Sequence, residues 1–221
     1  MHVRRLVLCL GVILGLTACA ARESPPTSSA SSSPTARVAV NPANIKRIRS
    51  ALPPGYEIAD VTGPVSVAGL WGFGPGWIAD PARCAVLADP APGDEGARGY
   101  SASGQGGTVH VVVAAAPGAP DSGLVAECAS WTMAFAHTTG EVTVVDPPRV
   151  DGADTVALTA STRTVVESGR ATDGAASTAQ AYLDGHVVFV TLVTDPGSPY
   201  PPLNSQFVID LLTATVAALR G

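Results

Sequence analysis

The chain has 221 residues, of which 46% are hydrophobic and 14% are charged, and its formal net charge at pH 7 is −5. This much apolar surface excludes intrinsic disorder over most of the length, and the length favours one domain with appendages. The acidic balance gives no reason to expect nucleic acid as a partner.

The first 18 residues have the organisation of a bacterial lipoprotein signal peptide. Two arginines precede an apolar run at residues 6–16, which is too short to span a bilayer as a mature helix. Leu-Thr-Ala-Cys at 16–19 resembles the bacterial lipobox, in which the peptide is cut before the cysteine. The alternative is an ordinary secretory peptide with a chance cysteine at its end. We predict a signal peptide over 1–18, and the resemblance implies that Cys19 carries a diacylglycerol.

Residues 20–40 consist largely of Ser, Thr, Pro and Ala. Such a stretch buries too little apolar surface to offset the entropy of ordering it, so we expect 19–40 to be a lipidated cysteine followed by a disordered tether. The remaining residues, 41–221, are expected to form the globular domain. This organisation predicts a protein held by lipid at the extracytoplasmic side of the cell membrane, because two or three acyl chains anchor firmly.

The globular domain is expected to open with a helix. Asn-Pro at 41–42 provides an N-cap and a proline for the first helical position, and apolar residues then recur at helical spacing. Pro-Pro-Gly at 53–55 ends this helix. A strand is expected over 56–61.

A glycine-rich stretch between residues 65 and 77 contains Trp71, Phe73 and Trp77, and Tyr56 lies just upstream. In one interpretation the rings fold inward as a lid on the sheet. In the other they form a partly exposed aromatic wall that binds a glycan, a lipid or a partner protein. These four aromatic residues are the candidate ligand-binding residues.

The cysteines predict one disulfide. Cys9 leaves with the signal peptide and Cys19 carries the lipid, so Cys84 and Cys128 remain in a compartment where disulfides persist. They lack Cys-x-x-Cys spacing and a neighbouring histidine, which argues against zinc. We expect a structural bridge between them, with Cα atoms about 4.4–6.8 Å apart.

Two further helices are expected around these cysteines. Asp-Pro at 80–81 is expected to open a short helix that carries Cys84. Residues 121–138 are interpreted as a longer helix. Its inner face would carry Leu124, Cys128, Trp131 and Phe135. Two strands, over 98–103 and 108–115, are expected between these helices.

The second half of the sequence predicts mainly strands, beginning with 141–145. Residues 155–167 alternate, and their polar face holds Thr159, Ser161, Arg163 and Glu167. Asp-Gly at 184–185 separates two β-rich runs and predicts a type I′ hairpin. The run 187–193 is apolar on both faces, which indicates a central strand.

A last helix is expected over 204–219. Its inner stripe would hold Val208, Leu211, Leu212, Thr215 and Leu219. Hairpin-linked strands with a few helices predict an α+β fold: a single domain whose antiparallel β-sheet is covered by helices, with a long C-terminal helix.

These features together resemble a known group of proteins. The lipobox, the tether, the opening helix followed by Leu-Pro-Pro-Gly-Tyr at 52–56, two lone cysteines and the closing helix resemble mycobacterial lipoproteins of unknown function. The resemblance covers the mature chain and rests on architecture. More distantly, the chain is similar to the extracellular sensor domain of the Ser/Thr kinase PknH, an α+β domain with two disulfides, of which at most one is matched here.

No sequence motif points to catalysis. His110, His137 and His186 each have a structural explanation, and neither a Gly-x-Ser-x-Gly elbow nor His-Glu-x-x-His occurs. The glycines at 72–76 lack the spacing of a dinucleotide or phosphate loop. We therefore expect a protein that is not an enzyme and has no cofactor or metal.

The leading functional prediction is a lipid-anchored lipoprotein of the cell envelope, a non-catalytic binding or accessory module. Its partner would be an envelope glycan, lipid or protein. The alternative is a carrier that encloses a lipid or glycolipid in an apolar cavity, which the strand 187–193 could line.

Overall fold

The computed structural model describes residues 39–194 and 197–221. The predicted signal peptide, Cys19 and nearly all of the predicted tether lie outside the described residues. The described residues belong to one compact unit. Among the helices of the described ranges, none has both the length and the apolar character needed to cross a membrane.

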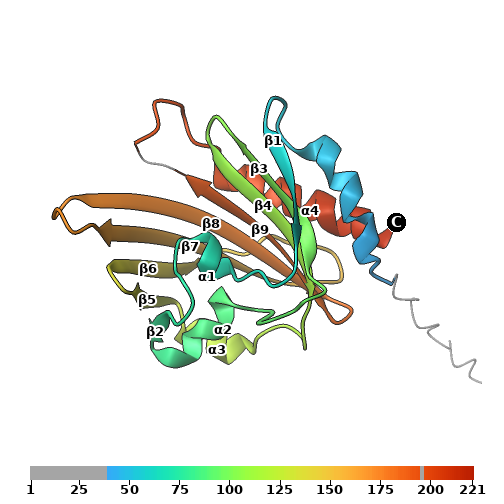
Figure 1. Ribbon diagram of the computed structural model, residues 1–221. Helices are drawn as coiled ribbons and strands as arrows, with labels where there is room; N and C mark the ends of the chain where they lie inside the picture. The colour runs from blue at the N-terminus through green and yellow to red at the C-terminus, as the bar shows by residue number, and fades with distance from the viewer. Residues whose placement is uncertain (1–38, 195–196) are drawn as a thin grey trace, which may run out of the picture. The chain divides into compact units, whose positions relative to one another are not determined.

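The domain is built on one antiparallel sheet of nine strands (Figure 1). Their spatial order is β1-β3-β4-β9-β8-β7-β6-β5-β2. The bounds are β1 Glu57–Thr62, β2 Ile78–Asp80, β3 Arg98–Gly104, β4 Gly107–Ala115, β5 Ser130–Phe135, β6 Thr138–Val145, β7 Asp154–Val165, β8 Ala171–Leu183 and β9 His186–Thr194. The apolar strand β9 lies between β4 and β8, which confirms that it is central. The edges are β1 and the three-residue β2.

Two helices pack on one face of the sheet, which we call the α4 face (Figure 1). They are the 3-10 helix η1 (Pro42–Ala51) and α4 (Ser205–Arg220). Asn41 and Asn204 cap them, each accepting a backbone N–H bond of 3.0 Å on its side-chain oxygen. The predicted inner stripe of α4 is buried, from Val208 to Leu219.

The other face, which we call the disulfide face, is covered by irregular chain and short helices. These are α1 (Val67–Leu70), η2 (Ala82–Cys84), α2 (Ala85–Ala88) and α3 (Ser122–Glu127). They build a second core with residues such as Met133, Val142, Leu158 and Phe189.

The two covers lie over different strands. The core beneath η1 and α4 draws its sheet residues from β3, β4, β8 and β9 and none from β5, β6 or β7. The core of the disulfide face includes residues from β4 to β9 but none from β1 or β3 among its fully buried members. The predicted antiparallel sheet and closing helix are therefore confirmed. The prediction that helices cover the sheet holds for only a part of each of its two faces.

The prediction of one helix over 121–138 is wrong. Helix α3 ends at Glu127, and β5 and the start of β6 occupy the rest. Trp131, Met133 and Phe135 alternate toward the disulfide face, and β5 pairs along its whole length with β6. Short apolar runs fit a helical and an alternating pattern equally well, and here the long-range pairing selects the strand.

The helix that was expected to start at Asp-Pro 80–81 does not form as predicted. Asp80 ends β2, its peptide bond to Pro81 is cis, and the helical residues that follow are divided between η2 and α2. Asp80 pairs with β5 through Thr132, so it does not serve as an N-cap. Two elements were not predicted: helix α1, which lies within the glycine-rich stretch, and strand β2, which follows it directly.

Candidate functional site

The predicted aromatic surface does not form. Trp71 and Phe73 are 4% and 3% exposed and belong to the core of the disulfide face. The indole N–H of Trp71 donates to the Thr178 hydroxyl at 3.1 Å. The ring of Phe73 packs over Gly140, where an added Cβ would lie 2.8 Å from Cζ of Phe73. For these two residues the inward interpretation holds, and a role as an exposed wall is wrong.

The other two candidate aromatics lie on opposite faces of the sheet. Trp77 is half-buried against the core of the disulfide face, whereas Tyr56 is half-buried against the core beneath α4. The hydroxyl of Tyr56 donates to the backbone carbonyl of Gln105. The four residues therefore do not share one binding surface.

The predicted disulfide is present. The Cα atoms of Cys84 and Cys128 are 5.6 Å apart, and both side chains are fully buried. Cys84 ends η2, and Cys128 is the C-cap residue of α3 instead of a member of a long helix. The bridge joins the two segments that cover the disulfide face.

The histidines are spread over the fold. His110 lies on the disulfide face of β4 between Ser101 and Thr191, and burial lowers its imidazole pKa. His137 lies between β5 and β6, and His186 begins β9 with Nδ1 2.9 Å from the Asp184 carbonyl oxygen. Within the described ranges no three His, Cys, Asp or Glu side chains gather as metal ligands would.

Half of the α4 face carries no covering element within residues 39–194 and 197–221, and we call it the open half-sheet. It consists of the outward side chains of β2, β5, β6, β7 and the first part of β8. Their neighbours in sequence, such as Trp131, Val142 and Ala160, point to the core on the other side. Three rows of side chains cross it. The first row is Ser130, Thr143, Thr159 and Ser177. The second row is Asp80, Thr132, Glu141, Ser161 and Ala175. The third row is Ile78, Ala134, Thr139, Arg163 and Asp173.

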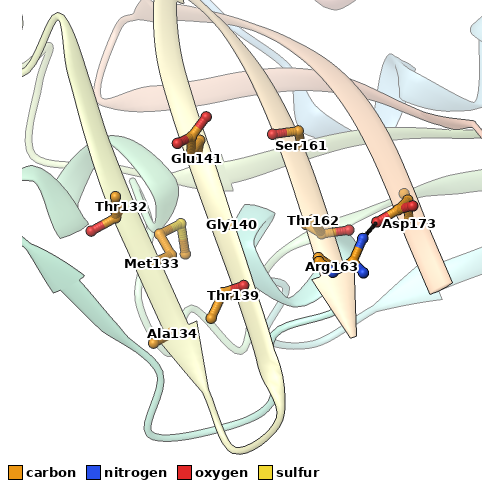
Figure 2. Close-up of a pocket in the computed structure, with 11 residues that line it drawn as sticks. Thr132, Met133, Ala134, Thr139, Gly140, Glu141, Ser161, Thr162, Arg163 and Asp173 are labelled. Atoms are coloured by element: carbon orange, nitrogen blue, oxygen red, sulfur yellow. Dashed lines mark hydrogen bonds and ion pairs between the residues drawn. The ribbon is translucent and has the colours of Figure 1, made fainter. Parts of the chain in front are cut away.

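This surface is hollowed. A groove of about 550 Å³ lies over the second and third rows, and Figure 2 shows how its lining residues are arranged. Glu141 and Ser161 extend from neighbouring strands at one end, and Arg163 lies at the other end, where its Nη1 donates to Oδ1 of Asp173 at 3.0 Å. Both charged partners are largely exposed, so the pair contributes little to the stability of the fold.

A second hollow continues the same face toward α4. It measures about 260 Å³ and is bordered by Val208 and Ile209 of α4 and by Val145 and Ala157 of the sheet. Thr159 and Ser177 of the first row also line it. The open half-sheet is thus polar and charged at its outer part and more apolar where it meets α4.

The arrangement offers hydrogen bonds and charge. Asp80, Glu141 and Asp173 supply carboxylates, Arg163 supplies one guanidinium, and the threonines and serines supply hydroxyl groups that both donate and accept. The alternation along residues 155–167 predicted Thr159, Ser161 and Arg163 on one polar strand face. Strand β5 was not predicted because the apolar spacing there indicated a helix, and β2 was not predicted because its residues were taken as irregular chain.

Comparisons with known proteins support this fold. An uncharacterised protein of Mycobacterium smegmatis, the Rv0999 ortholog, has a crystal structure that matches with a TM-score of 0.60 at 23% identity, over 82% of this chain and 98% of that one. The extracellular domain of PknH from Mycobacterium tuberculosis matches with a TM-score of 0.38 at 14% identity, over 81% of this chain and 93% of that one. The resemblance to a mycobacterial protein of unknown function is confirmed.

No curated protein is significantly similar to the chain. The family model described as a domain of unknown function, DUF5642, matches residues 41–220. Because that match spans most of the sequence, the chain belongs to the DUF5642 family.

Proposed function

We propose that this protein is a lipid-anchored, non-catalytic binding module of the cell envelope, and that it receives a glycan on the open half-sheet. One observation carries the proposal: a large part of one sheet face is bare and hollowed, although the same strands pack a core on their other side. A sheet ordinarily buries an apolar face against another layer. This half carries hydroxyls and charges instead, which suits a polar partner.

The chemistry of the rows favours a hydroxyl-rich ligand. Threonine and serine hydroxyls exchange hydrogen bonds with sugar hydroxyls, and Glu141 and Asp173 accept from them. At a strand spacing of about 4.8 Å, the four strands of the first row give it a length of about 14 Å, and the five strands of the second and third rows give about 19 Å. An elongated ligand can therefore lie across the strands and bind several rows.

The lipid anchor rests on the sequence. The lipobox-like residues before Cys19 and the Ser/Pro/Ala-rich segment after it fit a domain held at the membrane by a tether. The anchor would place the open half-sheet within reach of the envelope.

A lipid or glycolipid carrier is the second candidate. The hollow beside α4 is its best support, since apolar side chains line part of it, but about 260 Å³ is little space for acyl chains. Strand β9, which a carrier would need as the lining of its cavity, is packed on both faces. Its residues Val187, Val188 and Phe189 are fully buried. The binding module is therefore the better supported function.

Site-specific photo-crosslinking in the intact host envelope tests the binding surface. A photoreactive residue at Ser161 should give a discrete adduct that glycosidases shorten, and the same residue at Ala217, exposed on α4, should not. Thr139→Trp, at an exposed residue that lines the groove, should fill it and remove the Ser161 adduct. Equal labelling at both positions, or no adduct at Ser161, would overturn the proposed surface. Recovery of a chemically altered glycan would overturn the absence of catalysis.

Cell fractionation tests the anchor. Cys19→Ala removes the proposed acylation site, so the variant should leave the membrane fraction or remain unprocessed. A variant that is processed normally and still partitions wholly with membranes would contradict a lipid anchor at this cysteine.

A further inference from the structure

A second groove, separate from the open half-sheet, lies beside the short helix α2. It measures about 520 Å³, and its walls are almost entirely apolar. The residues that matter here are Trp77, Val86, Asp89, Pro90, Pro92 and Pro117. Trp77 precedes β2 and Pro117 follows β4. The other four residues belong to α2 and the chain that follows it. None of them lines either hollow of the open half-sheet.

Asp89 is the one acidic group in this lining. Its Oδ1 is buried and has no hydrogen-bond partner among the residues that the structure describes. Among the ion pairs found within residues 39–194 and 197–221, none includes it. Burial raises the pKa of this carboxyl group. A buried polar atom without a partner is uncommon in folded proteins and calls for a physical reason.

A nearby aspartate, Asp94, has the hydrogen bonds expected of a carboxylate with a structural role. Asp94 accepts from the backbone N–H of Gly96 at 3.0 Å and from that of Ala115 at 2.7 Å. It therefore fastens the loop to the end of β4. Asp89 makes no comparable bond, so loop structure does not account for it.

The remaining walls complement an organic cation. The half-buried ring of Trp77 lines the same groove as the carboxylate, and an aromatic ring and a carboxylate both attract an ammonium group. Val86 and the prolines offer apolar surface to the body of such a molecule. The volume lies within the range of about 300–1,000 Å³ that is typical of small-molecule sites.

We propose that this groove binds a small organic amine, with its ammonium group against Asp89 and its apolar body along Trp77 and the prolines. The ammonium group displaces no existing partner of the carboxylate. Rotation about the last side-chain bond of Asp89 brings either oxygen to the ligand. The site does not depend on the function proposed for the open half-sheet.

Titration with matched probes tests this site. The full mature chain with Cys19→Ala needs no detergent and is titrated with phenethylammonium, with neutral 2-phenylethanol and with phenylacetate, followed by the indole N–H resonance of Trp77. Phenethylammonium should bind saturably and at least about ten-fold more tightly than the other two, because only it forms the charged hydrogen bond. Equal affinity for the alcohol, or no saturable binding of the amine up to about 10 mM, would overturn the proposal.

Two variants locate the binding to Asp89. Asp89→Asn should weaken amine binding about ten-fold or more, and Glu95→Gln, which removes the same charge at an exposed position outside the groove, should not. The amine should raise the melting temperature of the parent protein and not that of Asp89→Asn. If Asp89→Asn does not fold, Trp77→Leu keeps the carboxylate, and the amine should no longer raise its melting temperature. Unchanged affinity in a folded Asp89→Asn variant, or the parent's full rise in melting temperature in Trp77→Leu, would contradict the site.

Discussion

The indole nitrogen of Trp71 donates a hydrogen bond of 3.1 Å to the hydroxyl of Thr178, and both side chains are buried. The same hydroxyl lies 2.9 Å from that of Thr191 on the neighbouring strand. This chain of polar groups fastens the glycine-rich stretch to β8 and β9. It explains why Trp71 faces the core, since a buried hydroxyl needs a partner.

Trp71→Phe should lower the free energy of unfolding by about 2–4 kcal/mol, because it removes this hydrogen bond and leaves a cavity. Urea denaturation measures the change. Thr178→Val should cost less in the Trp71→Phe background than in the parent protein, since the pair is already broken. Trp77→Phe, at a half-buried position, should cost less than Trp71→Phe. Equal losses at 71 and 77 would contradict the difference in packing.

The disulfide should contribute strongly to stability. Cys84 and Cys128 are 44 residues apart in sequence, and closing a loop of that size in the unfolded chain is worth about 3–4.5 kcal/mol. Cys84→Ser and Cys128→Ser should each lower the melting temperature, and the double variant should be no less stable than the single variants. Thiol titration of the native, non-reduced protein is the control, and two free thiols would contradict the bridge.

The β8–β9 hairpin depends on a turn with two positive φ angles. Asp184 has φ 46° and Gly185 has φ 72°, as the predicted type I′ turn requires. Gly185→Ala should reduce the free energy of unfolding by about 1–2 kcal/mol, because a Cβ is strained in this backbone region. Gly69→Ala in α1 is the matched control, since an added Cβ there meets its nearest atom at 3.7 Å. Chemical denaturation should show little loss for Gly69→Ala, and equal losses would contradict the argument.

His110 should make stability depend on pH. Burial lowers its pKa from the ordinary value of 6.5, so the folded protein favours the neutral ring. Its contribution is complete above the unfolded pKa and is lost as the pH falls below about 6.5 toward the folded pKa. The melting temperature should therefore fall between about pH 7 and pH 5, and His110→Gln should fall less. An unchanged profile in His110→Gln would contradict the role of this ring.

Several parts of the fold were determined by local sequence. The Asp184-Gly185 turn, the Asn204 cap and the buried stripe of α4 each depend on residues close together in the chain. The largely apolar β9 could be recognised as central, because only a strand covered on both faces can bury such a run. The cysteine count led to the disulfide because the predicted processing of the chain would leave two candidates.

The tertiary structure alone decided what the sequence pattern left ambiguous. The stretch that holds Trp131 and Phe135 fits a helix by spacing, and it became β5 because β6 and β2 supply its backbone hydrogen bonds. Whether Trp71 is core or surface depended on Thr178, which is 107 positions away. The open half-sheet exists because α4 lies over β8 and β9 and stops short of β5 to β7. Local sequence encodes turns, caps and periodicity, whereas the bare sheet face and the unpaired Asp89 arise from contacts between residues far apart in the chain, which no local pattern specifies.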